Sequence, residues 1–197
     1  MSRAWWWIVV LLGGMIGGVV MWQHMHKSGG SYATFTSPHL KIRFEYPQGW
    51  NVHEQAKPVG RVAGEVQIFG PRREDLKYSP YVAVSAETAE GPTNLNRTLE
   101  DAVKTALGRR QKLPSYRVID QEHERCAGKP AVRVLASYEL SLPLEAANRT
   151  TVAFREYLVY CLRDAQLFRL TFAAPADDFK KHEHAFRHLV KTFTFLP

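Results

Sequence analysis

The sequence lacks the short motifs by which many enzymes are recognised. Its 197 residues contain two cysteines, Cys126 and Cys161, which are too far apart for a C-x-x-C redox pair. There is no G-x-S-x-G nucleophile elbow, no G-x-G-x-x-G dinucleotide fingerprint and no P-loop. Because these motifs activate a nucleophile or hold a cofactor, their absence predicts that the protein is not an enzyme and carries no cofactor.

A strong excess of one charge is also missing. The formal net charge is +7, and the chain has no lysine run, no arginine-rich helix and no repeat of aromatic and basic residues. Nucleic acid is therefore not an expected partner. A modest positive charge favours a protein partner with an acidic surface or an anionic membrane surface, and solubility alone also explains it. The arginines that we expect to contact such a partner are Arg72, Arg73, Arg109 and Arg110.

Charged side chains are absent from residues 4–22, AWWWIVVLLGGMIGGVVMW. A helix of this length spans about 28 Å, close to the hydrocarbon thickness of a bilayer. Tryptophans, which favour the headgroup level, lie at both ends: Trp5, Trp6, Trp7 and Trp22. The pattern predicts a transmembrane helix. Two overlapping G-x-x-x-G pairs in it favour a homodimer, although glycine is common in membrane helices anyway: Gly13, Gly14, Gly17 and Gly18.

A cleaved secretory signal is the competing interpretation of this segment. The triplet Ser31-Tyr32-Ala33 has suitable small residues for cleavage, but it lies about ten residues too far along the chain. We therefore predict an uncleaved signal-anchor over residues 1–27, a flexible tether over residues 28–33 and one domain over residues 34–197. A short head before a large domain predicts that the domain lies outside the cytoplasm, at the cell surface, in the periplasm or in a lumen.

The remaining chain contains segments typical of strands and of helices. Two apolar stripes at three- and four-residue spacing predict helices, one capped by Thr98 and one behind Pro175. Four strand-like segments follow the first helix with short connections, so they are expected to be antiparallel neighbours. The predicted fold class is α+β, an antiparallel β-sheet packed between α-helices. The segments with strand patterns are residues 32–36, 40–46, 51–54, 64–70, 81–86, 116–122, 131–140, 150–162, 166–172 and 192–195.

The stretch FEYPQGW, Phe44–Trp50, ends one of these strands abruptly. Proline presets φ at the first corner of a tight turn, and Gly49 supplies a positive φ. The ring of Trp50 is then expected to fold back over the end of the sheet as an apolar plug, a role that needs no ligand.

This stretch, together with two others, resembles the PsbP-like superfamily, the relatives of the photosystem II extrinsic P protein. The other motifs are A-G-K-P-A (Ala127–Ala131) before a long hairpin and T-F-T-F (Thr192–Phe195) at the end of the last helix. The resemblance implies an antiparallel sheet between helices and a bacterial-type membrane-anchored member. It also implies a non-enzymatic accessory or assembly role outside the cytoplasm.

Cys126 and Cys161 are expected to belong to the same end of the sheet. If Leu140 pairs with Thr151, then Pro130 lies opposite Cys161, and a bridge requires the Ala127–Pro130 turn to curl back. In an oxidising compartment two cysteines favour a single disulfide, and two separate buried thiols are the alternative. We expect the disulfide.

A histidine pair in the last predicted helix is the most metal-like feature. His184 and His188 share a helix face at four-residue spacing and could bind one divalent ion. No third ligand is identifiable, and histidines are common on the exposed face of amphipathic helices, so no metal site is predicted.

The sequence as a whole predicts a membrane-tethered extracytoplasmic domain that binds a protein or helps to assemble a complex. The alternative is a carrier of a small molecule or lipid, with a pocket between sheet and helix.

Overall fold

A computed structural model describes residues 31–88, 98–143, 149–164 and 166–197 of the chain. Neither helix within these ranges is long and apolar enough to cross a membrane. The predicted membrane helix over residues 4–22, its glycine pairs and most of the predicted tether lie outside the described residues.

A small sheet is formed by the first strands and the last one. Its order is β1 (Tyr32–Ser37), β2 (Ile42–Pro47) and β10 (Thr194–Phe195), and all pairings are antiparallel. Because β1 begins at Tyr32, the sheet includes two residues that were expected in the tether.

A larger antiparallel sheet carries the remaining strands in the order β3-β4-β5-β9-β8-β7-β6. Its strands β6 to β9 are the four consecutive segments expected to be neighbours, and the structure confirms that arrangement. The register differs by one residue from the expected one, since Ala131 rather than Pro130 lies opposite Cys161. The bounds are β3 Asn51–Gln55, β4 Val62–Phe69, β5 Tyr81–Thr88, β6 Arg117–Cys126, β7 Lys129–Leu142, β8 Thr150–Arg163 and β9 Gln166–Pro175.

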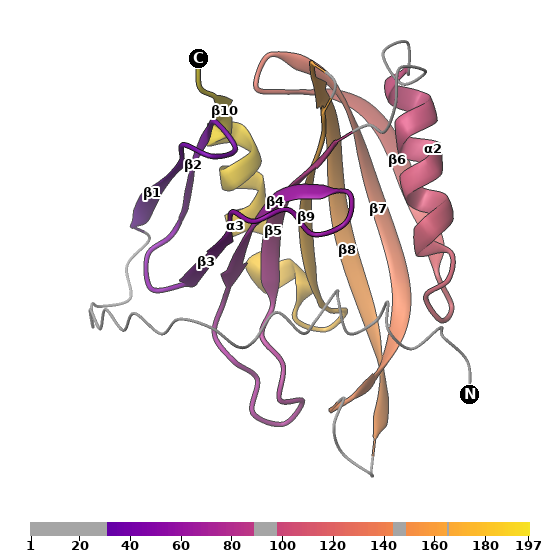
Figure 1. Cartoon of the computed structure of the whole chain (residues 1–197). Coiled ribbons are helices and arrows are strands. Elements are labelled where there is room, and N and C mark those ends of the chain that lie inside the picture. The colour runs from indigo at the N-terminus through magenta and orange to yellow at the C-terminus, as the bar shows by residue number, and fades with distance from the viewer. Residues whose placement is uncertain (1–30, 89–97, 144–148, 165) are drawn as a thin grey trace.

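Two helices, α2 (Leu99–Arg110) and α3 (Phe179–Thr192), pack on opposite faces of the large sheet (Figure 1). Alternation along β8 explains this, because Leu158 is buried with α2 whereas Val159 is buried with α3. The side chain of Thr98 accepts a hydrogen bond from the backbone N–H of Asp101, as expected of an N-cap. Helix α3 also contacts β2, so it lies between the two sheets.

The Phe44–Trp50 stretch behaves largely as expected. Phe44 is fully buried, and Gly49 has a φ of 91°. The backbone N–H of Trp50 donates to the carbonyl of Pro47, which makes proline the residue before the first corner rather than the corner itself. The indole of Trp50 packs against Gly70 and meets His182 of α3 edge-on, with ring centroids 5.7 Å apart. It packs against the larger core cluster.

Gly70 gives a direct test of this packing. A Cβ added at Gly70 would lie 2.9 Å from Cζ2 of Trp50, so we expect Gly70→Ala to destabilise the domain by about 1–3 kcal/mol in urea unfolding. The matched control is Gly108→Ala in α2, where an added Cβ meets nothing within 4 Å and should stabilise the helix by about 1 kcal/mol. Equal stability of the two variants would contradict the placement of Trp50.

Candidate functional site

The four predicted contact arginines do not form one surface. Arg72 is exposed and lies 3.6 Å from Glu74. Arg73 donates to Asp75 at 2.6 Å and to Asp177 at 2.9 Å, so its charge is compensated by two carboxylates. Both residues belong to the loop between β4 and β5, away from the other pair.

Arg109 and Arg110, at the end of α2, each pair with a buried glutamate, although Arg109 itself stays exposed. Nη1 of Arg109 donates to Oε2 of Glu87 at 2.9 Å, and Nη1 of Arg110 donates to Oε2 of Glu156 at 2.5 Å. The Arg110 side chain is 12% exposed and that of Glu156 is fully buried. Arg110 therefore does not lie on the surface where the sequence placed it.

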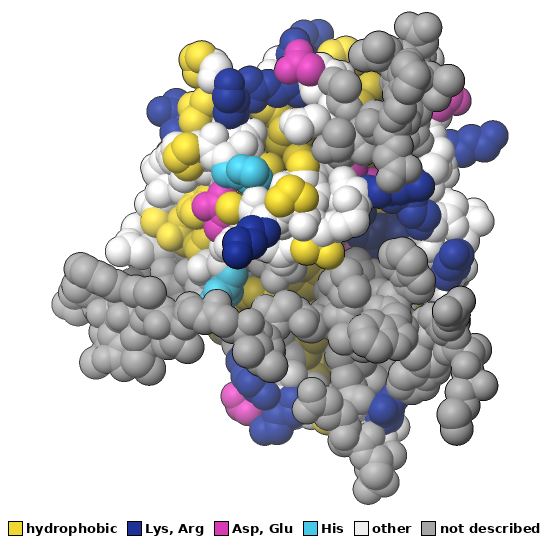
Figure 2. Space-filling view, in the orientation of Figure 1, with side chains coloured by type: hydrophobic (Ala, Val, Ile, Leu, Met, Phe, Trp, Pro, Cys, Tyr) yellow, Lys and Arg dark blue, Asp and Glu magenta, His cyan; other side chains and the backbone are white. Residues whose placement is uncertain are grey.

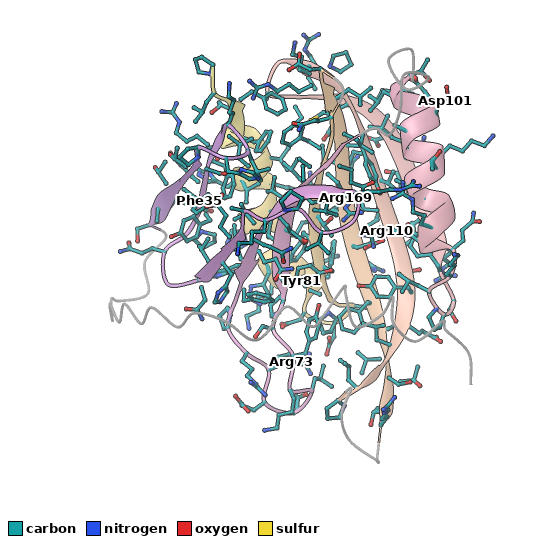
Figure 3. The ribbon with its side chains drawn as sticks, in the orientation of Figure 1. Phe35, Arg73, Tyr81, Asp101, Arg110 and Arg169 are labelled. Atoms are coloured by element: carbon teal, nitrogen blue, oxygen red, sulfur yellow. The ribbon has the colours of Figure 1, made fainter. Side chains whose placement is uncertain are left out.

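These ion pairs belong to a larger polar group on the face of the sheet covered by α2. Glu87 also accepts from Nη1 of Arg169 at 3.3 Å, and Arg169 lies between Ser85 of β5 and Tyr160 of β8 in the strand register. Figure 3 shows Arg110, Arg169 and Tyr81 over the same part of the sheet. We call this group the arginine–tyrosine cluster; its members are Tyr78, Tyr81, Ser85, Glu87, Arg109, Arg110, Tyr116, Tyr138, Glu156, Tyr160 and Arg169.

The cluster contains an unusual number of buried polar atoms without hydrogen-bond partners. Among the described residues eight side-chain atoms are buried and unpaired, and seven of them belong to this cluster. The Tyr116 hydroxyl approaches the Glu156 carboxylate and the Tyr160 hydroxyl approaches Arg110, but neither reaches hydrogen-bond geometry. The seven atoms are Nε of Arg110 and Arg169, the hydroxyls of Tyr78, Tyr116, Tyr160 and Ser85, and Oε1 of Glu156.

Burial governs the electrostatics of this cluster. It raises the pKa of the Glu156 carboxyl above its usual value, although the neighbouring Arg110 and Arg169 oppose that shift. Burial also raises the pKa of the Tyr116 and Tyr160 hydroxyls, which therefore stay protonated at neutral pH and can donate hydrogen bonds. The arrangement is suited to hold polar groups, and nothing in it resembles an activated nucleophile.

Sequence reasoning missed this cluster, although a signal was present. Phe154, Glu156, Leu158 and Tyr160 alternate onto one face of β8, so a carboxylate stands in an otherwise apolar or aromatic row. Arg169 lies on the same face of β9, opposite Tyr160. A charged residue on the buried face of a central strand is the pattern that could have found the site.

The histidines of α3 have separate surroundings. His184 is exposed, whereas Nε2 of His188 lies 2.7 Å from Oε2 of Glu45 and its ring stacks on Tyr32 at 3.6 Å. Within the described ranges no three His, Cys, Asp or Glu residues gather in a way that could hold a metal ion.

The two cysteines are free thiols, so the expected disulfide is absent from the structure. Both are buried in the core cluster around α3. The hairpin turn brings Cys126 back toward Cys161, with Ala127 and Gly128 at positive φ. A hydrogen bond with Cys161, together with burial, raises the pKa of the Cys126 thiol. The residues meet as expected, but as a thiol pair rather than as a bridge.

We expect both thiols to resist alkylation in the native protein. A raised pKa leaves little thiolate, the reactive form, and burial excludes the reagent. Iodoacetamide at pH 8 should leave the folded chain unmodified and add two groups after unfolding without reductant, as read by intact mass. Rapid labelling of the folded chain would contradict the described burial.

Comparison with solved structures identifies the fold. The PsbP protein of Synechocystis (CyanoP) matches with a TM-score of 0.53 at 15% identity, covering 93% of this chain and 98% of its own. The fold is PsbP-like. LpqN of Mycobacterium tuberculosis, involved in cell envelope biogenesis, matches with a TM-score of 0.53 at 16% identity, covering 87% of this chain and 88% of its own.

A third match extends the PsbP-like fold to a eukaryotic protein. The Ran-binding protein Mog1p of Saccharomyces cerevisiae has a TM-score of 0.51 at 12% identity, covering 85% of this chain and 97% of its own. No protein-family model matches the sequence. No curated protein matches it either. Identities this low establish the shared fold and nothing finer.

Proposed function

We propose that this chain is a membrane-tethered PsbP-like domain that works outside the cytoplasm as a non-enzymatic binding or assembly factor. The observation that carries the proposal is a complete PsbP-like fold placed shortly after the uncharged, tryptophan-flanked residues 4–22. A domain held in this way stays within a few tens of ångströms of the bilayer, where membrane complexes present their extracytoplasmic surfaces.

The names of two fold neighbours support an assembly or binding role. LpqN is involved in cell envelope biogenesis, and Mog1p is a Ran-binding protein. We propose a similar role for this chain, with a protein as its partner. Its acidic character is inferred from the net charge of +7.

The surface that we assign to this partner is the outer edge of β6. Val118 and Ile119 are 45% and 47% exposed, and a register shift between Val118 and Asp120 interrupts the pairing with β7. Within the described residues β6 ends the sheet, so its outer backbone groups are open to another strand.

The two faces of β6 differ in charge, and only the face on the α2 side lacks carboxylates that would repel an acidic partner. Its three carboxylates lie on the α3 side of the sheet, where Arg133 contacts all of them: Asp120, Glu122 and Glu124. On the other face, Gln121, His123 and Arg125 follow Val118, and none of them is acidic. Elsewhere, on the face shown in Figure 2, lysine and arginine side chains form several separate groups rather than one patch.

The test is co-purification of the detergent-solubilised full chain from membranes of its native host. The proposal expects one acidic protein to be retained, and Ile119→Asp to release it by adding a like charge to an apolar contact. Val59→Asp is the matched control, because Val59 is also 47% exposed but lies in the β3–β4 loop. Retention that is equal in the two variants, or no retained protein, would overturn the proposal.

A further inference from the structure

We infer that the arginine–tyrosine cluster is a binding site for a small hydroxylated organic anion, a function separate from protein binding at β6. The members come from α2, from the β4–β5 and α2–β6 connections and from four adjacent strands, β5, β9, β8 and β7. Segments far apart in the sequence thus bring their polar side chains to one part of the sheet (Figure 3).

Unpaired polar atoms at this depth are costly. Glu156 and Tyr160 have no exposed surface and Ser85 is 1% exposed, yet each keeps an unpaired oxygen. An unsatisfied buried polar group costs about 1–3 kcal/mol, and native proteins rarely gather several of them in one place. A polar molecule held among these side chains would supply hydrogen-bond partners that the protein itself does not supply.

The unpaired atoms define the chemistry of that molecule. Both arginines are held through Nη1 by glutamates, Arg110 by Glu156 and Arg169 by Glu87, which leaves each Nε–H buried and directed away from its partner. A guanidinium N–H can only donate, so the ligand must offer acceptors, and a carboxylate or phosphate is the group that arginine binds best. The hydroxyls of Tyr78, Tyr116 and Tyr160 can add donors to the same group.

Glu156 adds a second requirement. An ionised carboxylate accepts hydrogen bonds and cannot donate them. The unpaired Oε1 of Glu156 therefore requires a donor on the ligand, such as a hydroxyl group. Three arginines and two glutamates leave the cluster with one net positive charge, which a monoanion neutralises. A small hydroxy-carboxylate carries an acceptor, a donor and a single negative charge, and a hydroxylated phosphate ester carries the same acceptor and donor groups with a higher charge.

In the experiment, five small molecules are titrated into the detergent-solubilised full chain. Binding is measured by calorimetry and by the shift in the thermal unfolding temperature. Glycerate and glycerol 3-phosphate carry both groups, acetate and sulfate carry the anion alone, and glycerol carries only hydroxyls. We expect the first two to bind at least tenfold more tightly than the other three. If no hydroxylated anion binds, or if all five behave alike, the cluster holds ordered water only and the inference fails.

Two variants separate binding from folding. Tyr160→Phe and Ser85→Ala remove unpaired hydroxyls, so we expect each to weaken binding about tenfold while leaving the free protein as stable as before, or more stable. Tyr46→Phe, at the partly buried Tyr46 of β2, is the control and should leave binding unchanged. Lower stability of both free variants without any change in binding would show that the hydroxyls serve the fold through water and would overturn the inference.

Because Ile119→Asp lies outside this cluster, it should not affect anion binding, so the two proposals can fail independently.

Discussion

Replacement of Arg110 by methionine is expected to destabilise the folded domain by about 3–5 kcal/mol at pH 8. The change removes the 2.5 Å hydrogen bond from Nη1 of Arg110 and leaves the carboxylate of Glu156 buried without its nearest cation. Urea unfolding followed by tryptophan fluorescence measures the effect. The loss should appear as a lower midpoint with an unchanged m-value.

The double variant Arg110→Met/Glu156→Gln is the matched control. It removes the stranded charge, so we expect it to be more stable at pH 8 than Arg110→Met alone. Additive losses from the two single changes would show that the pair is not coupled and would contradict its role at the centre of the cluster.

The same variant should show a particular pH dependence. Burial already raises the pKa of Glu156 above 4.5, and removal of Arg110 removes an opposing influence. A carboxyl with a raised pKa in the folded state favours folding in its protonated form, so its contribution is lost as pH rises through the folded-state pKa. Arg110→Met should therefore be less destabilised at pH 5 than at pH 8, whereas the double variant should lack this difference.

Removal of residues 1–27 is expected to have the largest effect on where the protein is found. Residues 4–22 carry no charge and are long enough to span a bilayer, so the full chain should remain in membranes through an alkaline wash. The truncated chain begins ahead of β1 at Tyr32 and should be soluble, with the same unfolding midpoint. An intact mass of the mature protein that places its N-terminus near Thr34 would contradict the anchor.

The fold was largely predictable because its elements have local causes. Alternation in β7 and β8, the Thr98 cap and the apolar stripe of α3 each act within a few residues. The register was missed by one residue, since pairing of Leu140 with Val152 rather than Thr151 depends on how the hairpin connection is built.

The candidate site was much harder to predict because its causes are not local. Arg110 was expected on a surface that contacts a partner, and only the packing of α2 over β8 brings it to Glu156. The pairing of Cys126 and Cys161 was expected from topology, but whether two adjacent thiols are oxidised is a chemical state that the strand register does not determine.

The most direct test of the tethered binding domain is photo-crosslinking in intact cells of the native host. A photoreactive amino acid is placed at Ile119 of the full-length chain, and in a second strain at Val59, which is equally exposed. The account predicts one discrete adduct from Ile119 to an acidic protein with an extracytoplasmic surface, and no such adduct from Val59. Adducts that are the same from both positions, or an adduct from Ile119 to a cytoplasmic protein, would contradict it.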